Sequence, residues 1–328
     1  MKKWSFAIVV VTTVVALLWF TPSAEAKKHR LPRLHGTVLL VSYLPSDLAV
    51  TTEDKTSIIQ GGGEWYVAPS ISADGRVIAS ARSVADDPPA ARPRLIVGIY
   101  SMTDKRWTDY KDLVVFGDTV AISPDGSKLA CAIRKVSGAP SHFRFLDLRT
   151  GKITVGPQSS DNAGPHLSWS PDGRYIAFDR EVERRRNGEL IPPLQAVFVL
   201  DIEAGTVSKI ADGASPSWSP SGEWIAFYDY SPGRDIPDKR GRYDVGANRI
   251  SLIRPDGTDS KVLHVFHWLE NANGAPVWSP DSRTPLINDS QQESVNPKVN
   301  IHMLNIDTHK FRTKFWMTAP VYGWAAAQ

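Results

Sequence analysis

The sequence contains one cysteine in 328 residues, so no internal disulfide can form. Cys131 lies in the apolar string Lys-Leu-Ala-Cys-Ala-Ile, which predicts a small buried core residue. Without disulfides the fold must be stabilised by a large apolar core, and a chain of this length is long enough to build one.

Short catalytic motifs are lacking as well. The sequence has no H-E-x-x-H, G-x-S-x-G, P-loop or G-x-G-x-x-G motif. His264 and His267 are three residues apart near a predicted strand end, which would place them on opposite faces as a poor metal pair. Ser, His and Asp occur, but nothing in the sequence pairs them, so the sequence favours a non-enzymatic protein.

The chain lacks a strong excess of positive or negative charge, because its formal net charge is only +3 at pH 7. Domains that bind nucleic acid are usually strongly basic. We therefore expect no nucleic-acid partner and no strong attraction to anionic membranes, and we expect a monomer.

Long apolar runs are confined to the N-terminus. Lys2 and Lys3 precede an apolar run over residues 6–20, and Ala24 and Ala26 form an A-x-A cleavage pattern. This pattern predicts a secretory signal peptide over residues 1–26. The alternative is an uncleaved membrane anchor, but the run is short for a span, which needs about 20 apolar residues.

The predicted domain organisation follows from that cleavage site. We expect a signal peptide over residues 1–26, a linker over 27–35 and one folded domain over 36–328. The mature protein is then periplasmic or secreted, without stable membrane insertion.

One phrase occurs five times in the chain. The five segments are SISADGRVIASAR (70–82), AISPDGSKLACAI (121–133), SWSPDGRYIAFDR (168–180), SWSPSGEWIAFYD (217–229) and VWSPDSRTPLIND (277–289). They recur at roughly fifty residues, a period that indicates a stacked or radial repeat fold.

The centre of the phrase has the chemistry of a tight turn. Pro presets φ, Asp bonds back to the backbone, and Gly adopts the left-handed conformation that other residues resist. We interpret the turn aspartates as turn formers and not as acid catalysts. The turn residues are Asp74, Gly75, Asp125, Gly126, Asp172, Gly173, Gly222 and Asp281.

A second hairpin follows each phrase, as in FRFLDLRTGKITV (143–155) and VFVLDIEAGTVSKI (197–210). Each period therefore holds four short strands, and radial four-stranded blades form a β-propeller. A parallel β-helix is the alternative fold, but its coils are shorter and lack paired hairpins. The fold class we expect is all-β.

Both ends of the chain predict how the ring closes. Residues 319–324 match the start of the fifth repeat, so they supply the innermost strand of a further blade. Residues 37–43, 48–52 and 56–60 supply its other three strands. Pairing of the terminal strands would close a six-bladed propeller and leave no open edge, with seven blades as the main alternative.

The phrase W-S-P-D-G-x-x-I-A-F, followed by a V-x-D-x-x-x-G hairpin, resembles the repeat of TolB-type propellers over residues 36–324. The resemblance implies an exported bacterial protein with six blades. The same blades occur in protein-binding modules, in peptidase regulatory domains and in sugar-acting lyases. TolB itself has an α/β domain before its propeller, and this sequence has no counterpart of that domain between the cleavage site and the first strand.

The connections between blades are expected to meet at one mouth of the central channel. Oxygen ligands gathered there would suit calcium, while the alternative is that short polar loops satisfy their own backbone. No cofactor is otherwise expected. The candidate ligand or partner residues at this mouth are Glu64, Asp118, Asp161, His166, Glu270 and Asn273.

Two charged insertions, over residues 180–194 and 230–248, are predicted to be loops at the rim. They could dock an acidic partner, or they could be solvated loops whose charges balance. Their candidate binding residues are Arg184, Arg185, Arg186, Arg234 and Asp235.

The leading hypothesis is an exported, non-enzymatic propeller that binds another envelope or secreted protein. The alternative is a carbohydrate-active lyase or hydrolase with its site at the channel mouth. A third possibility is a subunit of a larger assembly with no ligand of its own.

Overall fold

The computed structural model describes residues 36–41, 48–52, 56–60, 66–83, 95–115, 120–134, 141–160, 166–230, 247–266, 274–291, 298–317 and 320–326. All of them belong to the compact unit Leu34–Gln328. The described residues form 23 β-strands, and none of them forms a helix that could cross a membrane. The predicted signal peptide (1–26) and linker (27–35) lie outside the described residues.

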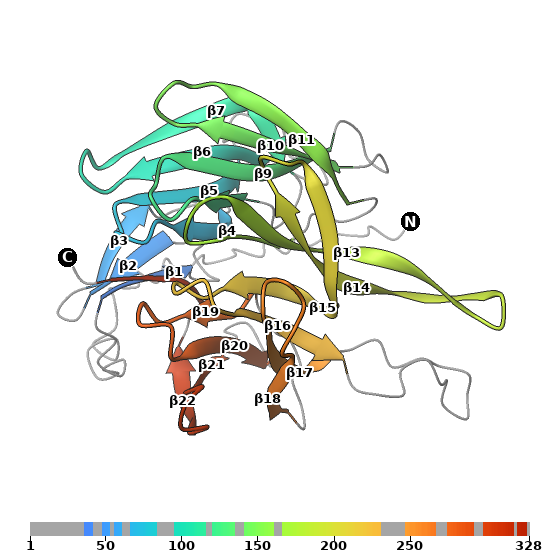
Figure 1. Ribbon diagram of the computed structural model, residues 1–328. Helices are drawn as coiled ribbons and strands as arrows, with labels where there is room; N and C mark the ends of the chain where they lie inside the picture. Colours follow the sequence, from blue (N-terminus) through green and yellow to red (C-terminus); the bar gives the residue numbers. More distant parts are fainter. Residues whose placement is uncertain are drawn as a thin grey trace, which may run out of the picture. The chain divides into compact units, whose positions relative to one another are not determined.

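Four of the sheets have four strands each (Figure 1). The first contains β1 (Thr37–Val41), β2 (Leu48–Thr51), β3 (Thr56–Gln60) and β23 (Val321–Ala325). The second contains β4 (Tyr66–Ile71), β5 (Val77–Ser83), β6 (Leu95–Ser101) and β7 (Arg106–Val115). The third contains β8 (Val120–Ile122), β9 (Lys128–Arg134), β10 (Ser141–Asp147) and β11 (Ile153–Ser160). The fourth contains β19 (Val277–Trp278), β20 (Pro285–Gln291), β21 (Lys298–Leu304) and β22 (Phe311–Met317).

The remaining sheet has seven strands in sequential order. They are β12 (Leu167–Trp169), β13 (Tyr175–Arg186), β14 (Glu189–Asp201), β15 (Thr206–Trp218), β16 (Ile225–Tyr230), β17 (Ala247–Ile253) and β18 (Lys261–Val265). The first part of β15 pairs with β14 and its last part pairs with β16, with a register shift between Ala214 and Ser217. The strand β15 therefore belongs to two sets of four strands, β12–β15 and β15–β18.

The innermost strands contact one another in a cycle. β4 contacts β8, β8 contacts β12, β12 contacts β15, β15 contacts β19, β19 contacts β23, and β23 contacts β4. The protein is therefore all-β, with four-stranded sheets in a propeller-like arrangement, as the repeat predicts.

The first and last strands pair with each other, as the ends of the sequence predict. β1 and β23 are antiparallel, with Thr37 opposite Ala325 and Val38 opposite Trp324. Val38, Val321 and Ala325 are buried at this junction. The pairing places β1 between β23 and β2, so β1 is not an open edge of the sheet.

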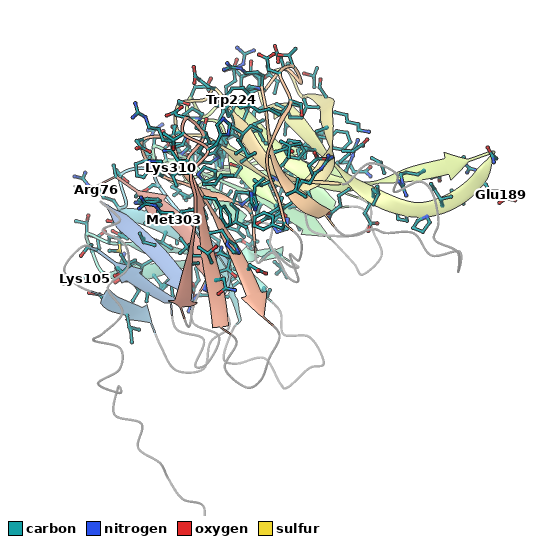
Figure 2. The ribbon with its side chains drawn as sticks, turned by 90° about the horizontal axis from the view of Figure 1, so that it is seen from below. Arg76, Lys105, Glu189, Trp224, Met303 and Lys310 are labelled. Atoms are coloured by element: carbon teal, nitrogen blue, oxygen red, sulfur yellow. The ribbon has the colours of Figure 1, made fainter. Side chains whose placement is uncertain are left out.

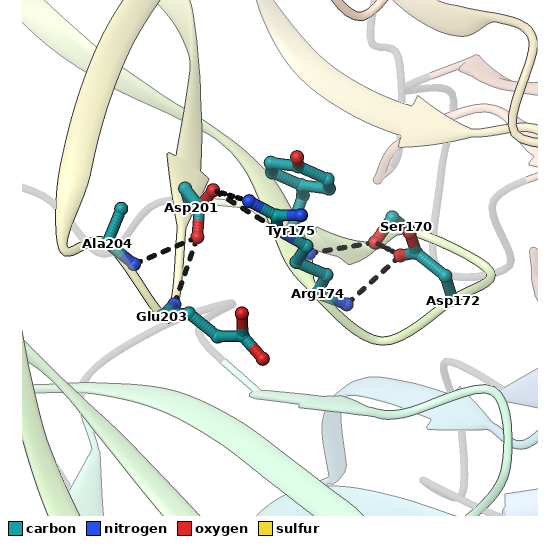
Figure 3. A network of polar contacts seen from close by, with 7 residues as sticks. All are labelled: Ser170, Asp172, Arg174, Tyr175, Asp201, Glu203 and Ala204. Carbon is teal, nitrogen blue, oxygen red and sulfur yellow. Dashed lines mark hydrogen bonds and ion pairs between the residues drawn. The ribbon is translucent and has the colours of Figure 1, made fainter.

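The repeated turn is held by a small network of hydrogen bonds, drawn for one repeat in Figure 3. The Ser170 hydroxyl accepts the N–H of Tyr175 at 2.8 Å and donates to the carboxylate of Asp172. Asp172 also accepts the N–H of Arg174 at 3.0 Å. Gly173 has φ of +69°, which a side chain would strain.

The network is shared by the other repeats and confirms the turn prediction. Ser72, Ser123, Ser219 and Ser279 each accept the N–H of the residue five positions later. Asp74, Asp125 and Asp281 each accept the N–H two positions later. In the fifth repeat Ser282 adopts the glycine conformation, with φ of +62°.

The core lies between neighbouring sheets and is built from the apolar strand that follows each turn. Ile176 and Phe178 pack toward Phe143 of the preceding sheet, whereas Ala177 packs toward Trp218 of the next set of strands. Burial on both faces explains why these strands are continuously apolar. Cys131 is fully buried as predicted, and its burial raises the pKa of the thiol to about 12.

Candidate functional site

Most of the residues predicted to form a site fall outside the described residues. These are Glu64, Asp118, Asp161, Arg234, Asp235, Glu270 and Asn273. Their convergence at the channel mouth, and the calcium site suggested for it, therefore stay predictions. Among the described residues, no group of three His, Cys, Asp or Glu side chains could hold a metal ion.

A cavity of about 360 Å³ lies where the innermost strands meet. Its wall includes one equivalent residue from each of these strands, the residue that precedes the repeated aromatic or aliphatic position. These residues are Ser70, Ala121, Ser168, Ser217, Val277 and Gly323. The repeat thus builds the cavity wall from the same position in each phrase.

Serine at this position links one inner strand to the next. Ser70 accepts the N–H of Ile122 at 2.8 Å, and Ser168 accepts the N–H of Trp218 at 2.9 Å. These bonds are structural, because they satisfy backbone donors that lie at the cavity wall.

Two of the repeated tryptophans also bond to the neighbouring inner strand. The indole N–H of Trp169 donates to the carbonyl of Ala121, and that of Trp278 donates to Ser217, each at 3.0 Å. Both rings are buried. This confirms that the tryptophan position packs neighbouring strand sets together and does not form an exposed aromatic platform for a sugar.

His166 is the one residue of the predicted mouth set that the structure describes, and it lines the cavity. Its Nδ1 lies 3.3 Å from the carboxylate of Asp179 and 3.2 Å from the hydroxyl of Ser215. Asp179 is buried and accepts the N–H of His166 at 2.8 Å and of Ser215 at 2.6 Å. Sequence reasoning missed Asp179 and Ser215, because Asp179 lies in the repeated phrase but nothing in the sequence pairs it with His166 or Ser215.

This cluster differs from a Ser-His-Asp catalytic triad. In a triad the carboxylate and the serine contact different ring nitrogens, so that the histidine can move a proton between them. Here both Asp179 and Ser215 lie beside Nδ1 of His166. Ser215 also has φ of +54°, a strained conformation for a residue other than glycine. The cluster joins two strand sets and orients the histidine ring on the cavity wall.

A neutral side chain, Asn288, binds the backbone of another inner strand in a similar way. Asn288 of β20 donates to the carbonyl of Val321 at 2.7 Å and accepts the N–H of Val321 at 2.9 Å. Asn288 and Asp179 occupy the same position of the repeat, the third residue after the first apolar position of the strand. A polar residue at this position fastens the following inner strand.

A third residue at this position, Tyr228, has no such bond. Its hydroxyl is buried with no hydrogen-bond partner among the described residues, and the same holds for Oδ1 of Asp289 and Nε2 of His302. Burial, reinforced by the nearby charge of Asp289, raises the pKa of Tyr228. His302 Nε2 lies 3.5 Å from Asp289 Oδ2, so these two buried side chains form a polar pair.

The segment 180–194 was predicted to be a rim loop, and that prediction is wrong. Its residues continue β13 and β14 as a two-stranded hairpin, which we call the arm. Figure 1 shows the arm running beyond the neighbouring strands, and Figure 2 labels Glu189 at its outer end. Asn187 and Gly188 form its turn with φ of +52° and +86°. The Asn-Gly pair is a strong hairpin signal that the sequence reasoning overlooked.

The structure brings the predicted arginines to the outer half of the arm. Arg184 donates to the carbonyl of Pro192 at 3.0 Å, and Arg185 donates to Glu183 at 2.8 Å. The side chains of Arg185 and Glu183 are more than half exposed, so their ion pair contributes little to stability. Leu190, opposite Arg185, is 62% exposed. For Arg186 only the backbone, opposite Glu189, is described.

Known proteins resemble this chain in fold and not in sequence. The sequence matches no protein-family model and no curated protein. The structure is similar to TolB from Acinetobacter baumannii, with a TM-score of 0.63 and 13% identity over 92% of this chain and 69% of that chain. A provisionally assigned TolB from Agrobacterium tumefaciens gives 0.51 and 18% identity over 85% of this chain and 88% of its own. Hydrazine synthase from Kuenenia stuttgartiensis gives 0.50 and 17% over 85% and 79%.

These similarities confirm the TolB-like propeller fold that the repeat indicates. At such identities they establish the fold alone and say nothing about the activity or the partners of this chain.

Proposed function

We propose that this chain is an exported six-bladed propeller that binds a partner protein through its arm and has no enzymatic activity. The observation that carries the proposal is the arm itself, a hairpin that extends past the sheet to which it belongs (Figure 1). The partner is another envelope or secreted protein, and the propeller is the rigid body that presents the arm to it.

The blade number is supported by the shared strand and by the inner cycle. Dividing the seven-stranded sheet at the register shift in β15 yields two sets of four strands, in addition to the four separate sheets. Six inner strands then follow one another around the cavity. On this account residues 36–328 form one propeller domain.

The binding role is supported by the exposure of the arm. The base of the arm is packed, since Leu194 is buried and Val182 packs against the core, but its outer part is a two-stranded ribbon, which is marginally stable alone and contributes little to the fold. The arm nevertheless carries three consecutive arginines and an exposed leucine, Leu190. Arginine and apolar side chains on a projecting element suit recognition of another protein better than they suit solubility.

Location follows from the signal-peptide pattern over residues 1–26 and stays part of the proposal. So do a monomeric state, the lack of a nucleic-acid partner and the lack of stable membrane insertion. The modest net charge of +3 supports the last two points.

The test is capture of the partner from an envelope extract of the source cell, with mass spectrometry and rebinding of the purified partner. We compare the parental protein with R184E/R185E/R186E. The matched control is R149E/K152E, which reverses two exposed charges at the β10–β11 turn. We expect the parental protein and the control to bind, and the arm variant to lose binding without a change in thermal stability. Binding that survives the arm substitutions contradicts the proposal.

A second candidate is a carbohydrate-active lyase or hydrolase with its site at the channel mouth. It is favoured by His166, whose ring is oriented by a buried carboxylate on the cavity wall. A histidine beside a carboxylate can act as a general base. Turnover of acidic polysaccharides that is lost in H166N, together with metal analysis of the purified protein, would identify this function in place of the first.

A further inference from the structure

The cavity where the innermost strands meet, which we call the axial cavity, has a wall that is complete at three consecutive levels. A level is one repeat position taken on every inner strand. The middle level holds the residues Ser70, Ala121, Ser168, Ser217, Val277 and Gly323. The level before it holds Pro69, Val120, Leu167, Pro216, Pro276 and Tyr322, and the level after it holds Ile71, Ile122, Trp169, Trp218, Trp278 and Trp324. All of these residues are described, and none of them carries a charge.

Small side chains at the middle level leave room for a ligand. Every inner strand carries serine, alanine, glycine or valine there, whereas the neighbouring levels carry mostly proline, isoleucine and tryptophan. The volume of about 360 Å³ lies in the range of small-molecule pockets and is enough for roughly ten water molecules. A ligand that fits gains affinity because it removes apolar wall from water.

Backbone polar groups of the inner strands are directed toward this space. In the third phrase the N–H of Ser170 donates to the carbonyl of Tyr175 at 2.9 Å. Bonded and non-bonded pairs alternate along an antiparallel ladder, so Trp169, opposite Ile176, belongs to a non-bonded pair. The N–H and the C=O of Trp169 are therefore directed away from β13. Because β12 is the inner edge of its sheet and lines the cavity, these groups are directed toward the axis.

The serines of the middle level add hydroxyl groups to the wall. Ser70 and Ser168 accept this type of N–H from the following strand, and each keeps its own hydroxyl proton to donate. Beside Trp169 the same position is Ala121, which has no hydroxyl to accept the N–H. Ser217 is the third serine of the level. The chamber therefore offers both donors and acceptors of hydrogen bonds on an otherwise apolar wall.

A charged ligand is disfavoured at this place. Burying a charge in apolar surroundings is costly without a partner of opposite charge, and the three levels provide none. The buried carboxylate of Asp179, beside His166 of the wall, opposes an anion. The same carboxylate already accepts the N–H groups of His166 and Ser215, which reduces its attraction for a cation.

We propose that the axial cavity binds one uncharged small molecule with a largely apolar body and an amide, or a similar group that both donates and accepts hydrogen bonds. The apolar body contacts the prolines and aliphatic side chains of the wall. The amide bonds to the serine hydroxyls of the middle level and to the backbone of Trp169. This site is independent of the proposed partner, because the described wall contains no residue of the arm.

The experiment uses the full mature protein and three probes of matched size and shape, namely benzamide, benzoate and benzamidinium. Binding of each is measured at pH 7 by titration with ligand-observed NMR. We expect benzamide to bind at least about tenfold more tightly than either ion, because only the ions bury an uncompensated charge. The arm variant R184E/R185E/R186E is expected to bind benzamide as the parental protein does.

Variants of the middle level assign the binding to the cavity. A121L/S217L fills the chamber from two strands, and we expect it to lose benzamide binding. S217V is the milder variant, because the equivalent residue of the next phrase is Val277 and a valine therefore suits the position. We expect S217V to weaken benzamide binding several-fold. The matched control is S208V on the same strand, where Ser208 is exposed. Thermal melting verifies the fold of each variant.

Absence of benzamide binding to the parental protein overturns the inference. Benzoate or benzamidinium that binds as tightly as benzamide overturns the assignment to an uncharged ligand. Benzamide binding that is the same in S217V as in S208V places the probe outside the chamber and also overturns the inference, even if A121L/S217L does not fold. None of these results affects the proposed role of the arm, which the partner-binding test decides separately.

Discussion

At the scale of single residues, the repeat position of Asp179, Tyr228 and Asn288 affects how the following inner strand is held. Asp179 and Asn288 each accept backbone N–H groups from the following inner strand, whereas the hydroxyl of Tyr228 has no partner among the described residues. The sequence places these residues at one repeat position but does not reveal their roles. Their partners come from the next part of the ring, and no local pattern encodes that contact.

Replacing Asp179 by alanine tests whether its hydrogen bonds to His166 and Ser215 stabilise the fold. The substitution leaves the N–H groups of His166 and Ser215 without their acceptor, so we expect the free energy of unfolding to fall by about 2–4 kcal/mol. Urea unfolding measures the change. The control is D172A, which removes an exposed turn carboxylate and is expected to cost about 1 kcal/mol or less. A D179A protein as stable as the parental one would show that these hydrogen bonds do not stabilise the fold.

Replacing Tyr228 by phenylalanine has the opposite expected sign. The phenol hydroxyl is buried without a partner among the described residues, and its removal relieves the cost of burying it. We expect Y228F to be unchanged or more stable by about 1 kcal/mol in urea unfolding. A loss of more than about 1 kcal/mol would reveal a hydrogen bond to this hydroxyl.

At the scale of elements, the repeated turn is the part that the sequence predicts best. Ser, Asp and Gly at fixed spacing are sufficient to make the turn, because all its bonds lie within a few residues. The arm is the part that was missed. Its charges and its two prolines resemble a loop, although Asn187-Gly188 indicates a hairpin. The continuous strand β15 was also missed, since no turn signal is needed where one set of strands passes directly into the next.

The turn carboxylates make the stability of these elements depend on pH. Partial burial opposes ionisation of Asp125, Asp172 and Asp281, but hydrogen bonds to each carboxylate outweigh it and lower the pKa below 3.8. A group whose pKa is lower in the folded state stabilises the fold above its unfolded pKa. That contribution is lost as the pH falls through the folded pKa.

Replacing these three aspartates by asparagine therefore reduces the sensitivity to acid. We expect D125N/D172N/D281N to be less stable than the parental protein at pH 7 and to lose less stability between pH 5 and pH 2. Urea unfolding at several pH values measures both curves. Parallel curves would show that these carboxylates do not contribute to acid unfolding.

At the scale of the whole molecule, the ends of the chain complete one sheet. The sequence predicts this pairing because residues 319–324 repeat the start of a phrase. The structure adds that Asn288 binds Val321 on both its N–H and its carbonyl, so β23 is fastened to β20 as well as to β1. Ala326 also donates to the carbonyl of Ala73, which ties the end of β23 to a turn of the next sheet.

Closure by β23 is the central claim, and thermal unfolding of a truncated chain tests it most directly. A chain that ends at Thr318 lacks β23, whereas a control that ends at Ala326 keeps every described bond of that strand. We predict that the control melts at the parental temperature and that the shorter chain loses its cooperative transition at that temperature. A cooperative transition of the shorter chain at the parental temperature would contradict the account.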